Sequence, residues 1–343
     1  MKIIDFEAHF YTKSCLNYMC KRDKYPRFVA ASESGSYNIE FSKEVVLYHG
    51  KPCIDKLLDI GTGRIAAMDQ AGVTLQILSL TTPSLDITDP NNDLVSLVQE
   101  ANDELFAAIQ QNPTRLKGFA ALATDNIPAA AKELERAISK LGFVGWLTHS
   151  NLGDGKYLDD KSYWPLFEAA QSLQVPIYLH PMVPGMKEFG KYGITSAGPA
   201  LGFQFDTALC LMRMILAGVF DEFPHLKIIL GHLGETMPFL MERLDFSYTN
   251  EALGHEPEFV KIRPKIKKLP SEVLRENVYV ATSGRFYHPV LEYTVQAMGA
   301  DSVLFASDYP YESLPKSVNF IKESKLSNDI IQKICIDNAG EFF

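Results

Sequence analysis

The chain has 343 residues, of which 46% are hydrophobic and 22% are charged, as is ordinary for a globular enzyme of one large domain or two smaller ones. Its formal net charge of −9, without a run of lysine or arginine, argues against a nucleic-acid or anionic-membrane surface. The first residues become acidic before any long apolar stretch, and no segment reaches the roughly 18–20 apolar residues that cross a bilayer. We therefore expect no signal peptide, no membrane contact and a cytoplasmic location.

The cysteines support this location, because their number is odd and no C-x-x-C pair occurs. We expect all five to have structural roles. They are Cys15, Cys20, Cys53, Cys210 and Cys335.

The first expected strand covers residues 3–6 and ends in two potential metal ligands, Glu7 and His9. In an extended backbone, residues i and i+2 point to the same side, so this carboxylate and this imidazole would face one spot. Residues 10–54 lack sustained periodicity. We expect them to form an irregular insertion that covers the mouth of a barrel or packs against another subunit.

Strands and helices alternate through the rest of the chain. Short apolar runs predict strands at residues 73–80, 116–122, 143–147, 175–179, 226–230, 278–281 and 302–306. Helical spacing predicts helices at residues 55–72, with Gly72 as the stop, and at 93–111, 128–141, 163–173, 207–217, 236–245, 288–298 and 328–339. With the first strand, this order predicts one (β/α)₈ TIM barrel, an α/β fold, spanning residues 1–343. Two doubly wound domains are the alternative, but no G-x-G-x-x-G or Walker loop occurs.

Polar residues with metal-ligand chemistry follow four of the eight expected strands. Besides Glu7 and His9, these are His180, the pair His232 and Glu235, and Asp308. Each has a plain alternative explanation, such as a buried hydrogen-bonded histidine or a helix cap. Those explanations do not account for the shared position at strand ends, where a barrel assembles its active site. The pattern therefore predicts a mononuclear divalent-metal site.

The other histidines carry weaker expectations. His149 follows the fourth strand and could line the mouth, and His49 in the insertion could reach the site. His225 lies at the opposite end of the barrel, His255 has no expected role, and His288 begins a helix.

The strand-end motifs EAH (7–9), YLHP (178–181), GHLGE (231–235) and SDYP (307–310) resemble the amidohydrolase superfamily. Within it, they are similar to metal-dependent nonoxidative decarboxylases of the γ-resorcylate, 2,3-dihydroxybenzoate, 5-carboxyvanillate and aminocarboxymuconate semialdehyde type. Further similar stretches are LLDI (57–60), RIAAMD (64–69), AND (101–103), LGFVG (141–145) and FDEFP (220–224), so the resemblance covers nearly the whole chain except the insertion.

The resemblance implies Glu7, His9, His180 and Asp308 as metal ligands, with His232 and Glu235 as an acid–base pair. Asp308 would also donate a proton to the ring carbon before carbon dioxide leaves. Arg243 would engage the substrate, and His49 could assist it. The sequence departs from superfamily hydrolases, which open with H-x-H and often carry a lysine on the fourth strand. That departure favours decarboxylation, with a metal-dependent lactone or amide hydrolase as the alternative. The ligand set suits one Mn²⁺ or Zn²⁺ ion per subunit, and relatives with this opening suggest Mn²⁺.

The implied substrate is a small hydroxybenzoate-like aromatic acid, and the implied assembly is a homodimer or homotetramer. Aromatic side chains near the strand ends could hold a flat ring. The candidates are Phe10, Trp146, Tyr309 and Tyr311.

Overall fold

Eight parallel strands form the centre of the protein in a computed structural model that describes residues 2–89, 94–252 and 254–343. Their order in the sheet follows the chain. They are β1 (Ile4–Phe10), β5 (Leu75–Leu80), β6 (Leu116–Ala120), β7 (Gly145–His149), β8 (Ile177–His180), β9 (Ile228–Leu230), β10 (Val278–Ala281) and β11 (Val303–Leu304). All eight expected strands are confirmed.

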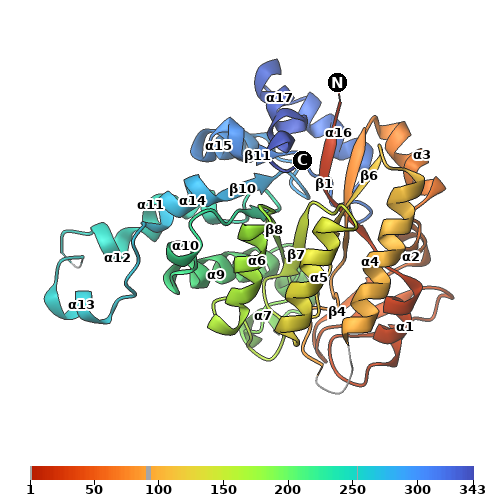
Figure 1. The fold of residues 1–343 in the computed structure, drawn as a ribbon, viewed down its shortest axis with the longest axis horizontal. Helices are drawn as coiled ribbons and strands as arrows, with labels where there is room; N and C mark the ends of the chain where they lie inside the picture. The colour runs from red at the N-terminus through yellow and green to blue at the C-terminus, as the bar shows by residue number, and fades with distance from the viewer. Residues whose placement is uncertain (1, 90–93, 253) are drawn as a thin grey trace.

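The segment that follows β11 joins the two edges of this sheet into a barrel. The Phe6 amide donates to the Phe305 carbonyl at 3.0 Å, and the Asp308 amide donates to the Glu7 carbonyl at 2.9 Å. Helices pack around the barrel, as Figure 1 shows, so the expected TIM-barrel fold is confirmed.

Ten helices of eight or more residues belong to the barrel part of the described chain. They are α3 (Thr62–Ala71), α4 (Leu94–Gln111), α5 (Ile127–Ser139), α6 (Trp164–Ser172), α9 (Gly202–Leu216), α11 (Met237–Leu244), α14 (Pro270–Asn277), α15 (His288–Met298), α16 (Leu314–Lys322) and α17 (Asn328–Cys335). Shorter helices are α7 (Lys187–Gly190), α8 (Ile194–Ala197), α10 (Val219–Glu222), α12 (Phe246–Thr249) and α13 (Pro257–Ile262). The last two project from one side of the barrel (Figure 1, left). None of the helices in the described residues is both long and apolar enough to cross a membrane.

Local capping explains where several helices begin and end. Asn126, Ser313 and Ser327 each accept a hydrogen bond from a backbone amide of the first turn of α5, α16 and α17. Gly72 ends α3 in the left-handed conformation, at φ +78°, which glycine adopts without steric cost. The expected stop at Gly72 is therefore confirmed. The expected start of the next helix, Asp93, lies outside the described residues.

Two expectations about the first 72 residues were wrong. The insertion is ordered: it contains α1 (Lys13–Lys21), an antiparallel sheet of β2 (Arg27–Ala30), β3 (Tyr37–Glu40) and β4 (Val46–His49), and α2 (Lys51–Leu58). Its four-residue strands are too short to produce a detectable alternation in one sequence. The expected single helix at 55–72 is broken at Asp59, whose side chain accepts a hydrogen bond from the Gly61 amide.

A bulge in β1 determines which side chains reach the barrel mouth. The pairing of β1 with β5 shifts register between Asp5 and Ala8. Phe6 packs in the inner core cluster with Ile77 and Tyr178, whereas Ala8 packs in the outer cluster beneath the helices. Because the bulge resets the alternation of side chains, the neighbours Phe6 and Glu7 can both face the barrel interior, and His9, two residues after Glu7, faces the mouth with it.

Candidate metal centre

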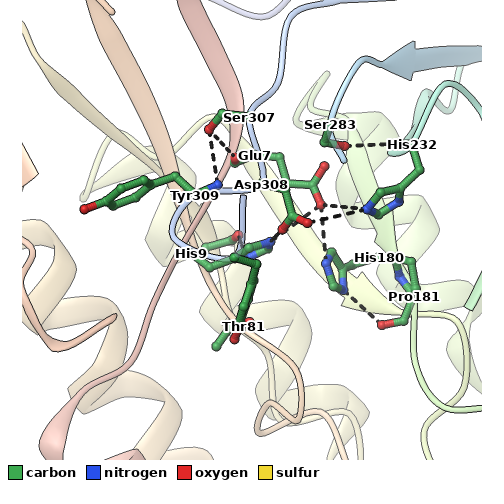
Figure 2. Close-up of polar contacts among 12 residues, drawn as sticks. Glu7, His9, Thr81, His180, Pro181, His232, Ser283, Ser307, Asp308 and Tyr309 are labelled. Carbon is green, nitrogen blue, oxygen red and sulfur yellow. Dashed lines mark hydrogen bonds and ion pairs between the residues drawn. The ribbon is translucent and has the colours of Figure 1, made fainter. Parts of the chain in front are cut away.

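Four side chains from three strand ends meet at the mouth of the barrel. One ligand atom from each of Glu7, His9, His180 and Asp308 lies within 4.8 Å of the others. His9 Nε2 lies 3.5 Å from Glu7 Oε1 and 3.2 Å from Asp308 Oδ1, and His180 Nε2 lies 3.3 Å from Glu7 Oε1. Figure 2 shows the two carboxylates and the imidazoles turned toward one another.

The polar atoms of this cluster fit a divalent cation. Glu7 Oε1 and His9 Nε2 are buried and have no hydrogen-bond partner in the described protein. A buried polar atom without a partner is costly, so two of them facing each other indicate a missing ligand between them. Two carboxylates and two imidazoles suit Mn²⁺ or Zn²⁺.

Neighbouring groups orient each of the predicted ligands. His180 Nδ1 donates to the Pro181 carbonyl at 2.9 Å, which leaves its Nε2 lone pair for a metal. His9 Nδ1 lies 3.2 Å from Ser79 Oγ, and the Tyr178 hydroxyl donates a short hydrogen bond to Glu7 Oε2. Asp308 adopts a left-handed conformation, at φ +62°, which turns its carboxylate back toward β1.

The electrostatics of the cluster attract positive charge. Burial raises the pKa of Glu7, but His232, His180 and His9 together hold it well below its usual range. Burial lowers the pKa of His9, yet hydrogen bonds to Asp308 and Glu7 raise it to about 9. Burial lowers the pKa of His180 to about 4, so this imidazole is neutral, as a ligand must be.

His232 and Glu235 form a hydrogen-bonded pair beside this cluster. His232 Nδ1 lies 2.8 Å from Glu235 Oε1, and His232 Nε2 lies 3.9 Å from both Glu7 Oε1 and Asp308 Oδ2. Burial lowers the pKa of His232, but Glu235 and Glu7 raise it well above its usual range. The arrangement can hold a proton next to Asp308 and the pocket.

The backbone around His232 is unusual. Residues 232–235 all have positive φ, and only Gly234 among them lacks a side chain that resists it. The His232 amide donates to Ser283 Oγ at 3.0 Å, which anchors the turn to the loop after β10. Backbone strain of this kind persists where the surroundings enforce it, and it is concentrated at functional sites.

Gly284, in the same loop, provides a test of this packing. A Cβ atom at position 284 would lie 2.9 Å from His232 Cδ2 and 3.7 Å from Asp308 Oδ2, at φ +64°. We expect Gly284→Ala to displace the His232 ring and lower kcat about 100-fold, because misplacement by about 1 Å is known to cost this much. Gly153→Ala is the matched control, because Gly153 also has a positive φ, +81°, but an added Cβ there has open space. Steady-state kinetics and thermal melting check the prediction, and an unimpaired Gly284→Ala enzyme would contradict it.

A cavity of about 510 Å³ opens above the cluster. Its lining includes His180, His232 and Asp308 from the barrel and residues 47–50 from the insertion. Part of the insertion thus lines a cavity at the barrel mouth of its own chain, and its expected placement over the mouth or against another subunit stays a prediction.

His49 reaches this pocket. Its ring lies 5.3 Å from that of Tyr311, which also lines the cavity, and burial lowers its pKa to about 4. A neutral His49 could hydrogen-bond to a substrate, although its expected substrate-binding role stays a prediction.

Arg243 does not line this pocket. It lies on α11 with an exposed side chain, and its guanidinium stacks 4.1 Å from the ring centroid of Phe246. The described residues that line the pocket include Arg285, from the loop after β10, and the expected substrate-binding role of Arg243 stays a prediction. Helical periodicity places Arg243 correctly on a helix but cannot show which side of the helix faces the mouth, and Arg285 lies in a loop without a pattern.

Three of the expected ring-binding residues lie elsewhere. Phe10 and Trp146 are fully buried in the core, and Tyr309 stacks beneath the Arg64 guanidinium at 5.1 Å. Tyr311 alone of the four lines the pocket. Strand-end aromatic residues pack inward or outward depending on register, which a single sequence does not reveal.

Of the remaining histidines and cysteines, some match their expected places and others do not. His225 and His255 are exposed, and His288 begins α15 as expected, with its ring stacked on Phe320. Cys20 is exposed and Cys53 lines the pocket, so the cysteines are not all packing residues. Burial raises the pKa of the Cys53 thiol to about 11, so this thiol stays protonated.

Asp86 was missed by the sequence reasoning. Its carboxylate accepts hydrogen bonds from the Thr148 hydroxyl and the His149 amide and lies 3.0 Å from His149 Nδ1. The His149 ring lies 5.2 Å from that of the predicted ligand His180. The loop containing Asp86 has no motif, and the position of His149 at a strand end was its only signal.

Comparison with known proteins identifies the class. The sequence profile of the amidohydrolase family matches residues 4–343, and the chain belongs to this family. The chain is 35% identical over 297 residues to γ-resorcylate decarboxylase from Polaromonas sp. strain JS666, covering 84% of this chain and 88% of that protein.

Solved structures agree with this assignment. The structure of 5-carboxyvanillate decarboxylase from Sphingomonas paucimobilis has a TM-score of 0.86 and 30% identity, covering 99% of this chain and 98% of that one. Dihydroxybenzoic acid decarboxylase from Polaromonas sp. JS666, solved with manganese and 2-nitroresorcinol, has a TM-score of 0.84 and 31% identity, covering 99% and 96%. Within the amidohydrolases the chain is thus a carboxy-lyase, a metal-dependent decarboxylase, and the alternative of a hydrolase is less supported.

Proposed function

We propose that this protein removes carbon dioxide from a small aromatic acid that carries a hydroxyl group next to its carboxylate. The single observation that carries this proposal is the position of Asp308 between the ligand cluster and the pocket. Its Oδ1 faces His9, its Oδ2 faces His232, and its side chain is 15% exposed, whereas those of Glu7 and His9 are fully buried. Asp308 can therefore both belong to the metal site and touch a substrate.

The chemical problem is the electron pair that remains when carbon dioxide leaves an aromatic ring. Protonating the ring carbon first avoids an aryl carbanion. Burial raises the pKa of Asp308, but hydrogen bonds to His232 and His9 hold it below its usual range, so Asp308 must first take up a proton. We propose that the protonated His232 passes the proton on Nε2 to Asp308 and that Asp308 delivers it to the ring carbon. His232, oriented by Glu235 at Nδ1, would then take up the proton of the hydroxyl through Nε2. A divalent ion held by Glu7, His9, His180 and Asp308 would act as a Lewis acid and template for the substrate.

The pocket walls would position the ring. Tyr311 and Phe203 supply apolar surface, and the neutral His49 supplies a hydrogen-bonding group. These walls would also exclude water, so that the proton goes to the ring carbon.

The mechanism predicts where solvent hydrogen enters the product. Manganese-loaded protein incubated with 2,6-dihydroxybenzoate in D₂O should release carbon dioxide and place one deuterium at the carbon that carried the carboxylate. Gas detection and mass spectrometry measure both. Turnover of lactones or amides with no carbon dioxide from a panel of hydroxybenzoates would contradict the proposal.

Other expectations accompany this function. A homodimer or homotetramer is proposed because large apolar side chains such as Phe239, Ile262 and Tyr287 are exposed. The partner molecules proposed are aromatic acids and not nucleic acids or membranes, given the net charge of −9. Five free cysteines support a reducing, cytoplasmic location.

A further inference from the structure

Arg285 is a positive charge in the pocket that the proposed chemistry does not use. Among the described residues that line the cavity, it is the only lysine or arginine, whereas Glu235, Asp308 and Glu312 are acidic. Arg285 is partly buried, and no hydrogen bond or ion pair engages its guanidinium within the described part of the chain.

The buried Arg64 is an example of a structural arginine in the same barrel, with its guanidinium hydrogen-bonded to the protein itself. Its guanidinium donates to the carbonyls of Asp59, His9 and Lys56 and also contacts Gln76. Arg64 is therefore satisfied by the fold itself. Arg285 has no such set of partners, so its side chain can meet a ligand without first breaking internal contacts.

The loop after β10 places Arg285 beside the reacting groups. The preceding residue, Gly284, packs directly against the His232 ring and close to Asp308 Oδ2. Arg285 therefore enters the cavity from the side of the acid–base pair.

The charges in the pocket leave Arg285 without a counterpart. Glu7 and Asp308 supply two negative charges that a divalent ion would balance, and His232 is paired with Glu235. Glu312 also lines the cavity, but no ion pair joins it to Arg285 in the described structure. A ligand with an additional negative charge would complete this side of the pocket.

We propose that Arg285 binds a second carboxylate of the aromatic substrate, one that is not lost in the reaction. This inference rests on the proposed function, which assigns the departing carboxylate and its neighbouring hydroxyl to the ligand cluster and His232. A third substituent of the ring is then the group left to meet Arg285. The planar guanidinium forms two parallel hydrogen bonds with a carboxylate, which gives both affinity and orientation. The substrate class is a hydroxybenzene dicarboxylic acid.

The test compares matched pairs of substrates that differ in one charge. Each pair is a 2-hydroxybenzoate with a second carboxylate at ring position 3, 4 or 5 and the same compound with a carboxamide there. The manganese-loaded wild type should prefer one dicarboxylate over its carboxamide by about 10- to 100-fold in kcat/KM, as expected for a charge-assisted hydrogen bond. Arg285→Gln should abolish this preference through a higher KM for the dicarboxylate, with little effect on the carboxamide.

Two further variants define the result. Arg275→Gln removes the same charge from an exposed position on α14 and should keep the full preference. Arg285→Lys should keep part of it, because a lysine supplies charge without the planar fork. A wild type without preference at any ring position, or an Arg285→Gln enzyme that retains it, overturns the inference.

Isothermal titration calorimetry of the same pairs separates this inference from the proposed function. Binding of a dicarboxylate that depends on Arg285, without carbon dioxide release, supports the assignment of Arg285 and contradicts decarboxylation. Decarboxylation without any dependence on Arg285 supports the proposed function and contradicts the assignment of Arg285. If no pair of compounds is bound or turned over, both the proposed function and the assignment of Arg285 are overturned.

Discussion

Asp308→Asn is expected to lower kcat about 10³-fold or more while the protein stays folded. The amide has nearly the shape of the carboxylate but has no acidic proton to give to a ring carbon, and general acid–base groups contribute about 10²–10⁴-fold to rate. The fold should be retained because the Asp308 amide donates to the Glu7 carbonyl, and this hydrogen bond does not depend on the side chain. Carbon dioxide release under single-turnover conditions measures the chemical step directly.

Two measurements must accompany the Asp308→Asn kinetics. Elemental analysis shows whether the variant retains metal, because Asp308 Oδ1 also belongs to the ligand cluster. Circular dichroism and thermal melting show whether the fold is intact. A metal-loaded, folded variant with near-normal turnover would exclude Asp308 as the proton donor. If the variant loses both activity and metal, the assay is repeated at saturating Mn²⁺, where the proton-transfer defect should remain.

Glu7→Gln is expected to weaken metal binding at least about 100-fold. Replacing a group that only supports a ligand typically costs 10–100-fold in affinity, and Glu7 is itself a predicted ligand. The change preserves volume and the acceptor for the Tyr178 hydroxyl but removes the negative charge that faces His9 and His180. Mn²⁺ titrations of metal-free protein, followed by calorimetry, give the affinity directly.

Glu312→Gln is the matched control for Glu7→Gln, because it makes the same change in a pocket residue outside the ligand cluster. Its metal content should equal that of the wild type. Removing the metal from the wild type with a chelator should lower its melting temperature, since a ligand that binds only the folded state stabilises it. The melting temperature of Glu7→Gln should respond little to the chelator. Wild-type metal occupancy in Glu7→Gln would remove Glu7 from the ligand set.

Some features were determined by the sequence alone because each depends on a local pattern. Apolar runs of four to eight residues identified the strands that follow β1, and the polar residue after each run could be read directly. The parallel barrel then requires that strand ends meet, so Glu7, His180 and Asp308 were predicted to converge without knowledge of any distance. Motif similarity supplied the pairing of His232 with Glu235, which the structure places 2.8 Å apart.

Other features depended on the tertiary structure because they concern the direction in which side chains point. The bulge in β1 lets Glu7 face the barrel interior next to Phe6, and no sequence pattern predicts this bulge. The insertion has strands of four residues, too short for their burial pattern to be recognised, yet it contributes His49 to the pocket wall. Likewise, only the packed barrel shows that Asp86 supports His149.

The two arginines illustrate the division most clearly. Arg243 lies on a helix whose position was predicted, but which way its side chain points is set by how α11 packs, and it is exposed. Arg285 lies in an irregular loop, and the close packing of Gly284 on His232 brings it to the pocket. Sequence patterns therefore determined which strand ends carry the chemistry, because parallel strands must share an edge. The three-dimensional packing of loops and helices decided which charges a substrate meets, because such contacts join residues that no periodicity relates.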